Sequence, residues 1–311
     1  MKKLHLAVVA TSLLVMPVGT TFAQEAATDS GAAIEANPNA AMEDAEAVEA
    51  VEEGHSERPH YPLEHPEEMS WSFAGPFGNW DLQQLQRGYK VYKEVCAACH
   101  SMNLVAFRNL EALGYSEEQV STIAAEFTVT DGPDSSGEMF DRPATGSDYF
   151  PAPYPNPEAS AAANNGAVPP DLSLIAKARA VERGFPTFVF DLFSQYQEAG
   201  PDYIHALLTG YGEEPPADMQ IMDGTYYNPY FISGPALAMP QPIYDDQVEY
   251  TDGTPQTVDQ YSRDVSAFLM WAAEPHLAER KATGFVTMIF LIIFAVLLFL
   301  VKRRVWSGFA H

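Results

Sequence analysis

The only two cysteines of this 311-residue chain, Cys96 and Cys99, are three positions apart, and His100 follows directly. Two thiols at this C-x-x-C-H spacing can bond to the two vinyl groups on one edge of a porphyrin, with the histidine as an axial ligand of the iron. A zinc site would need a second pair of ligands, and a redox dithiol would lie in an alternating strand–helix pattern. A disulfide is the simplest alternative. The pattern predicts one covalently bound haem c.

The ligand on the other side of the iron decides what such a haem can do. An open position permits ligand binding or peroxide chemistry, whereas a methionine thioether closes it and favours electron transfer. Met102 is too close to the attachment motif to reach the opposite face, and Met270 fits core packing in a helix. Met239 is preferred, because prolines on both sides can hold an irregular segment rigid. The full set of candidates in the domain is Met102, Met139, Met219, Met222, Met239 and Met270, of which Met219 and Met222 stay open as alternatives.

Residues 282–301 form a run of twenty residues without a charge. As a helix with a rise of about 1.5 Å per residue, the run would span about 30 Å, the thickness of the hydrocarbon core of a bilayer. Lys302, Arg303 and Arg304 follow at once, and positive residues stay on the cytoplasmic side. The run therefore predicts a single transmembrane helix in membrane lipid, followed by a cytoplasmic tail at 302–311.

The N-terminus has the pattern of an export signal. Lys2 and Lys3 precede an uncharged run at 4–18, and small residues around Ala23 suit a signal peptidase. An uncleaved anchor would need a longer apolar run. We expect a signal peptide at 1–23 and a haem domain in the periplasm of a bacterial inner (cytoplasmic) membrane.

Acidic residues dominate the exported part of the chain. Five of the 17 basic residues lie outside residues 24–281 and all 42 acidic residues lie inside, which leaves a net charge of −30 there. This excludes nucleic acid as a partner and favours a cationic one. Residues 25–57 hold ten acidic and no basic residues and few large apolar groups, so we expect an acidic disordered segment over 24–69. It is either a solubilising extension or a recruiting arm for a basic protein.

Hydrophobic periodicity predicts a mainly α domain with long irregular loops over residues 70–281. Asp81 can cap a helix that runs to Val95, and Thr257 with Gln260 forms a capping-box signature before a second helix that ends near the start of the anchor. Shorter helices are expected at 116–127 and 203–210, and a proline-rich surface loop at 128–157. A short hairpin near 248–253 stays open.

Six segments together resemble the cytochrome c1 family, and the resemblance covers roughly residues 70–305 in order. The segments are 86–102, 165–173, 207–211, 227–231, 238–240 and 268–275. The resemblance implies that the chain has a cytochrome c-like fold and is the haem subunit of the cytochrome bc1 complex, ubiquinol:cytochrome c oxidoreductase. Such a subunit relays electrons from the Rieske iron–sulfur protein to a soluble or tethered cytochrome c. Such a subunit has no catalytic residue that makes or breaks covalent bonds. Cytochrome b is a further expected partner.

The resemblance also implies roles for individual residues. His100 and Met239 would be the axial ligands, Arg179 would lie near a haem propionate, and the segment from Asn165 to Pro170 would lie beside the haem. Without the family, Arg179 is better explained as a solvated helix charge. Two other functions are weighed: an independent membrane-tethered or oxidase-associated cytochrome, which predicts a flexible linker before the anchor, and a peroxidase, which predicts an exchangeable sixth ligand.

Overall fold

The computed structural model describes residues 63–179, 187, 189–190, 198–217 and 219–308. They all belong to one unit of the chain, Tyr61–His311. The expected signal peptide at 1–23 and most of the expected acidic segment lie outside the described residues. The last three residues of the expected cytoplasmic tail also lie outside them.

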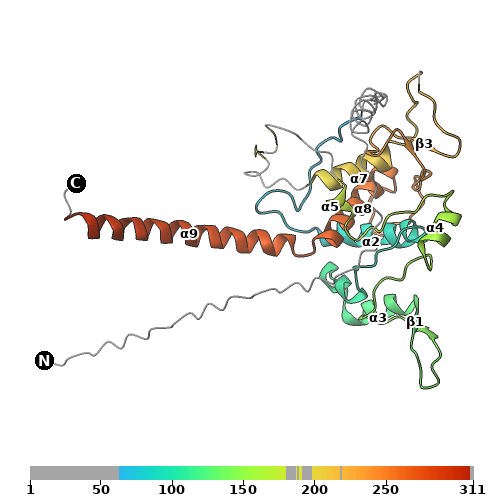
Figure 1. Ribbon diagram of the computed structural model, residues 1–311, viewed down its shortest axis with the longest axis horizontal. Coiled ribbons are helices and arrows are strands. Elements are labelled where there is room, and N and C mark those ends of the chain that lie inside the picture. The colour runs from blue at the N-terminus through green and yellow to red at the C-terminus, as the bar shows by residue number, and fades with distance from the viewer. Residues whose placement is uncertain (1–62, 180–186, 188, 191–197, 218, 309–311) are drawn as a thin grey trace, which may run out of the picture. The chain divides into compact units, whose positions relative to one another are not determined.

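The described part of the chain is mainly helical, as the sequence predicts (Figure 1). Strands form two small antiparallel pairs: β1 (Thr128–Asp131) with β2 (Phe140–Pro143), and β3 (Tyr226–Tyr227) with β4 (Ala236–Leu237). Thr128 lies opposite Pro143, and Tyr226 lies opposite Leu237. The helices are α2 (Leu82–Glu94), α3 (Glu117–Ala125), α4 (Pro157–Ala163), α5 (Ile175–Ala178), α7 (Ala199–Thr209), α8 (Val258–Ala273) and α9 (Leu277–Trp306), with two 3₁₀ helices, η1 (Cys96–Ala98) and η2 (Phe107–Leu113).

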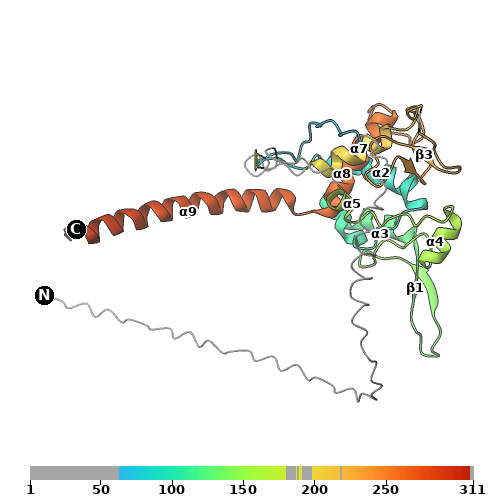
Figure 2. The same cartoon turned by 45° about the horizontal axis from the view of Figure 1, so that its top comes forward.

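The core of the domain forms where α2 packs against α8, and the two helices lie side by side in both views (Figures 1 and 2). The ring of Tyr89 on α2 lies 5.7 Å from that of Phe268 on α8, and both residues are buried. Gly88 permits this close crossing, because a Cβ there would overlap the backbone carbonyl of Asp264. Arg87 closes the contact with a 2.9 Å bond from Nε to the fully buried carboxylate of Asp264.

The helix starts follow the predicted capping residues. Asp81 accepts hydrogen bonds from the first-turn amides of α2, and the Thr257 hydroxyl accepts one from the Gln260 amide at 3.3 Å. Only half of the predicted capping box forms at Thr257, because the Gln260 side chain donates instead to Asp264 at 2.9 Å. The Gln260 side chain is drawn away from the helix start because the buried carboxylate of Asp264 needs hydrogen-bond donors.

Residues 128–157 are not one long loop, so that prediction is wrong. The strands β1 and β2 form a hairpin inside this stretch, and Arg142 fastens it by bonding both Asp131 and Asp148. At its end Asn156 caps α4, whose first residue is Pro157. Proline at the first helical position loses no hydrogen bond, so its presence was a helix-start signal rather than a loop signal.

The hairpin left open near 248–253 does not form in the described chain. Val248 instead directs both its backbone groups to the buried hydroxyl of Tyr261, at 3.2 Å from its amide nitrogen and 2.5 Å from its carbonyl oxygen. These groups are therefore occupied by a side chain and cannot pair with a strand.

Three residues separate the end of α8 from the start of α9. Its 30 residues have a mean hydropathy of 3.1 over their most apolar stretch, and it is the one helix of the described chain long and apolar enough to cross a membrane. Its large apolar side chains from Phe285 to Val301 are exposed. A single C-terminal transmembrane span therefore fits the described chain, as the sequence predicts.

Candidate functional site

The cysteine motif is wound into a tight turn directly after α2. The helix ends at Glu94, and the backbone carbonyl of Cys96 then accepts hydrogen bonds from the amides of Cys99 at 3.1 Å and His100 at 2.9 Å. Both thiols are free. Burial raises the pKa of the Cys96 thiol to about 12, so this group is a neutral thiol at neutral pH. The turn brings the two thiols and the imidazole of the motif close together.

His100 is oriented by a residue far away in the sequence. Its Nδ1 atom lies 2.8 Å from the carbonyl oxygen of Pro170. A carbonyl only accepts, so Nδ1 carries the proton in this contact and Nε2 keeps its lone pair. Burial lowers the pKa of His100, although the Pro170 carbonyl opposes this. A neutral imidazole with an unprotonated Nε2 is the form that binds a metal.

The chain around Pro170 is fastened to the motif by Asp171. Its carboxylate accepts hydrogen bonds from the Ser101 hydroxyl and the Asn103 amide, both at 2.8 Å, and from the Ser173 amide at 2.8 Å. In addition, the Leu172 amide donates to the Ser101 carbonyl at 2.8 Å. Asp171 is a site residue that the sequence did not predict. Its Asp-x-Ser pattern is a signal for a carboxylate that bonds the backbone two residues on, but the pattern does not reveal the distant partners.

Asn165 helps to shape the turn that leads from α4 toward Pro170. It adopts a left-handed backbone conformation with φ of 52° and is exposed. The next residue, Gly166, donates its amide to the Ala161 carbonyl at 2.8 Å, which closes the end of α4. Asparagine tolerates this conformation better than most residues do. The backbone conformation of Asn165 thus belongs to the end of α4.

Burial separates the candidate methionines. Met270 is fully buried in the core, as expected, and so is Met102, whereas Met139 and Met222 are 59% and 72% exposed. Met239 follows β4 and is partly buried against the core, and the Tyr211 hydroxyl donates to its carbonyl at 2.9 Å. Met219 is partly buried as well, so burial does not separate it from Met239. Burial favours Met239 over Met222 as a thioether that could be held in place.

Arg179 lies at the C-terminal end of α5 and is exposed. Its guanidinium makes no hydrogen bond or ion pair with another described residue. Contacts within the described chain join Cys96, Cys99, His100 and Pro170 into one group. No hydrogen bond or ion pair between described residues links Arg179 or Met239 to it.

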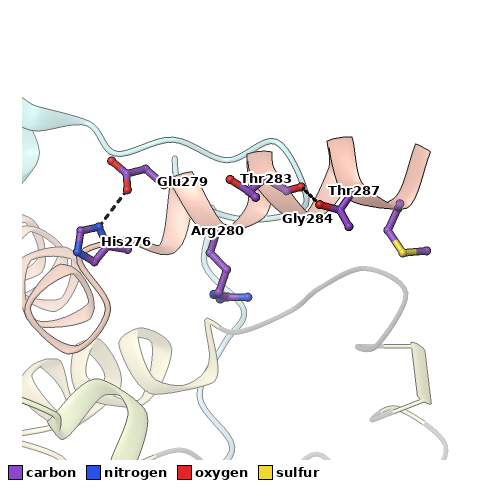
Figure 3. A pocket seen from close by; sticks show the side chains of 7 residues that line it. His276, Glu279, Arg280, Thr283, Gly284 and Thr287 are labelled. Carbon is purple, nitrogen blue, oxygen red and sulfur yellow. Dashed lines mark hydrogen bonds and ion pairs between the residues drawn. The ribbon is translucent and has the colours of Figure 1, made fainter. Parts of the chain in front are cut away.

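These residues fit a covalently attached haem c. The donor set consists of two free thiols at the required spacing and an imidazole whose Nε2 is left open by the bond to Pro170. A separate shallow hollow runs along the first turns of α9, and no residue of the haem motif lines it. Figure 3 shows the residues that do: His276, Glu279, Arg280, Thr283, Gly284, Thr287 and Met288.

Comparison with known proteins gives a consistent family. The Cytochrome C1 family matches residues 71–309, which is more than half of the chain. "Cytochrome c1" of Blastochloris viridis is 48% identical over 78% of this chain and 86% of its own length. The mitochondrial "Cytochrome c1, heme protein" of Saccharomyces cerevisiae is 46% identical over 78% of this chain and 73% of its own.

One relative is considerably longer. "Cytochrome b/c1" of Bradyrhizobium diazoefficiens is 55% identical over 245 residues, which are 78% of this chain but 36% of that protein. The chain thus spans only about a third of the length of that relative. The family match and the identities of these relatives agree with the resemblance seen in the sequence, and the chain belongs to the cytochrome c1 family.

Proposed function

We propose that this chain is the membrane-anchored haem subunit of a cytochrome bc1 complex in a respiratory or photosynthetic chain. In this role it relays electrons from the Rieske iron–sulfur protein to a cytochrome c, as part of ubiquinol:cytochrome c oxidoreductase. The observation that carries the proposal is the 2.8 Å contact between His100 Nδ1 and the Pro170 carbonyl, directly beside two free thiols. Family membership and the names of the relatives support it.

Each site residue has a defined task in this proposal. Cys96 and Cys99 would hold one haem c through thioether bonds, His100 Nε2 and the Met239 sulfur would bind its iron, and Arg179 would pair with a propionate. The bound haem supplies reversible one-electron redox chemistry. The protein needs no acid, base or nucleophile, since its residues bind, orient and bury the cofactor.

The same proposal gives the chain its place in the membrane. The haem domain lies in the periplasm, α9 crosses the bacterial inner membrane once, and the tail after residue 301 lies in the cytoplasm. Cytochrome b and the Rieske protein are neighbouring subunits. The net charge of −30 over residues 24–281 suits a cationic cytochrome c as the electron acceptor.

The connection between α8 and α9 favours a subunit of a complex over an independent tethered cytochrome. Only Glu274, Pro275 and His276 separate the two helices. The Glu274 carboxylate also bonds Lys177 on α5 at 2.7 Å and Arg280 on α9 at 2.6 Å. A tethered cytochrome that moves between complexes would need a flexible linker between domain and anchor. The short connection and the ion pairs of Glu274 make this junction rigid.

The proposal is tested by purifying the full-length protein from membranes. Haem should stay with the polypeptide in denaturing electrophoresis, and a variant with Cys96→Ala and Cys99→Ala should lose it. A b-type haem and a Rieske protein should accompany the native chain. Haem that extracts freely from the native chain would remove covalent attachment, and purification without those two partners would remove the role in a bc1 complex.

A further inference from the structure

Residues 71–80 form a strap of ten uncharged residues that lies against the base of the anchor. The Lys281 ammonium, which belongs to a residue only 5% exposed, donates to the Phe73 carbonyl at 2.8 Å. The Trp80 indole lies 3.4 Å from the Pro275 carbonyl. These two contacts hold the strap at both ends beside the junction of α8 and α9. In Figure 3, the pale blue ribbon, which is the N-terminal part of the described chain, passes next to the first turns of α9.

The middle of the strap turns outward at Phe77. The Gly78 amide donates to the Gly75 carbonyl at 3.4 Å, and Gly75 has a φ of 67°, so the chain reverses tightly here. This reversal leaves Phe77 68% exposed, although Trp71 and Phe73 in the same strap are buried. The ring of Phe77 instead meets Phe285 of α9 edge to face, with 5.0 Å between the centroids.

The contact with Phe285 fixes the level of Phe77 along the anchor. Phe285 is the fourth residue of the uncharged run that begins after Lys281, so it lies about 6 Å further along the helix than that last charge. Phe77 therefore lies where the hydrocarbon core begins if α9 crosses the membrane. Aromatic side chains are favoured at the boundary between lipid and water.

We propose that the turn at residues 75–78 dips into the outer face of the bilayer and is a second contact of the domain with lipid, with Phe77 as the inserted side chain. The inference rests on α9 being the membrane anchor. Lipid is favoured over a protein partner because the exposed ring of Phe77 is continuous with the exposed apolar surface of α9 from Phe285 onward. The strap, held by Lys281 at Phe73 and by Pro275 at Trp80, would fix the domain relative to the membrane surface.

Nitroxide labels test the level of Phe77 directly. The full-length haem-loaded protein, with any subunits that accompany it, is placed in phosphatidylethanolamine–phosphatidylglycerol vesicles. Single labels are attached to Phe77→Cys, to Leu291→Cys in the middle of α9, and to Leu104→Cys. Leu104 is the matched control, because it is apolar and 62% exposed but lies four residues after His100 of the haem motif. The native chain, treated in parallel, reports any labelling of Cys96 and Cys99.

Collision rates with oxygen, which partitions into lipid, and with a water-soluble nickel chelate are then compared. We expect the oxygen-to-nickel ratio at position 77 to exceed that at 104 several-fold and to approach that at 291. A ratio at 77 equal to that at 104 would overturn the inference, and so would protection from both reagents, which would mean that a protein subunit covers the turn. A water-exposed label at 291 would overturn the anchor itself, so the two failures are distinguishable.

Discussion

The imidazole Nδ1 of His100 lies 2.8 Å from the carbonyl oxygen of Pro170, across seventy residues of sequence. The contact sets which imidazole nitrogen is left open to a metal, and it depends on the hydrogen bonds that fasten the chain after Pro170 to the chain after His100. Asp171 supplies two of these links, by accepting hydrogen bonds from Ser101 and Asn103, and a third bond from the Ser173 amide holds its carboxylate in place. Orientation of the proposed iron ligand therefore depends on a carboxylate that does not contact the ligand.

Replacement of Asp171 tests this dependence. Asp171→Ala should lower the free energy of unfolding of the haem-loaded protein by about 2–4 kcal/mol, because three donors lose a charged acceptor. The reduction potential should rise, since a weaker bond to Pro170 makes the imidazole less basic and ferric iron less stabilised. Pro170→Ala is the control, because it keeps the backbone carbonyl. Denaturant titration and redox titration measure both effects, and an unchanged potential in Asp171→Ala would show a purely structural residue.

Met239→Leu tests the proposed sixth ligand. Leucine nearly preserves the side-chain volume but removes the sulfur, so the fold should persist. The reduction potential should fall by roughly 0.2 V or more, a fraction of the ~0.8 V range that axial ligands set. The ferrous protein should also begin to bind carbon monoxide, which is read from its absorption spectrum. Ready binding of carbon monoxide by the native protein would favour the peroxidase alternative. An unaltered reduction potential in the variant would mean that Met219 or Met222, and not Met239, is the sixth ligand.

Gly88→Ala tests the crossing of α2 and α8. The new Cβ would overlap the Asp264 carbonyl, so the helices must separate and the free energy of unfolding should fall by about 2 kcal/mol or more. Gly146→Ala is the matched control, since a Cβ there meets its nearest neighbours at 3.9 and 4.0 Å. Denaturant midpoints of the two variants give the comparison. Equal midpoints would mean that the two helices cross less tightly than described.

Glu274→Gln tests the junction between the domain and the anchor. Burial raises the pKa of Glu274, but hydrogen bonds from Lys177 and Arg280 outweigh it and hold the pKa below its ordinary value of 4.5. A lowered pKa in the folded state means stability that is present above 4.5 and is lost as the pH falls through the folded-state pKa. The variant should therefore be less stable by about 1 kcal/mol at neutral pH and equal to the native protein in acid. Thermal unfolding across this pH range measures the difference, and a pH-independent difference would contradict it.

Deletion of residues 25–57 tests where the attraction for a cationic cytochrome c resides. The deletion removes ten of the thirty net negative charges between residues 24 and 281. We expect the second-order rate of electron transfer at 0.15 M salt to change little, because the Debye length there is only about 8 Å and the other twenty net negative charges remain on the chain. Stopped-flow rates over a salt series measure this. A several-fold loss of rate with unaltered haem spectrum would make the acidic segment a recruiting arm.

Local signals predicted the helices well and the loops poorly. Asp81 and Ser116 mark helix starts that the structure contains, because an N-cap bond joins residues two or three positions apart. In contrast, the proline-rich stretch after Thr128 contains a hairpin and the start of α4. Its strands are held by the ion pairs of Arg142, and its prolines serve a helix start, so composition alone suggested the wrong structure.

The family, the mainly helical class, the apolar anchor and the identity of the candidate haem residues could be read from the sequence, because each depends on spacing over a few residues or on composition along a run. Three contacts emerged only from the folded chain: Pro170 and Asp171 position His100, the backbone of Asp264 packs against Gly88, and Phe77 lies against Phe285. These contacts join residues 68 to 208 positions apart, and the path of the loops between them is set by burial and hydrogen bonding in the whole fold. No local periodicity encodes such a path.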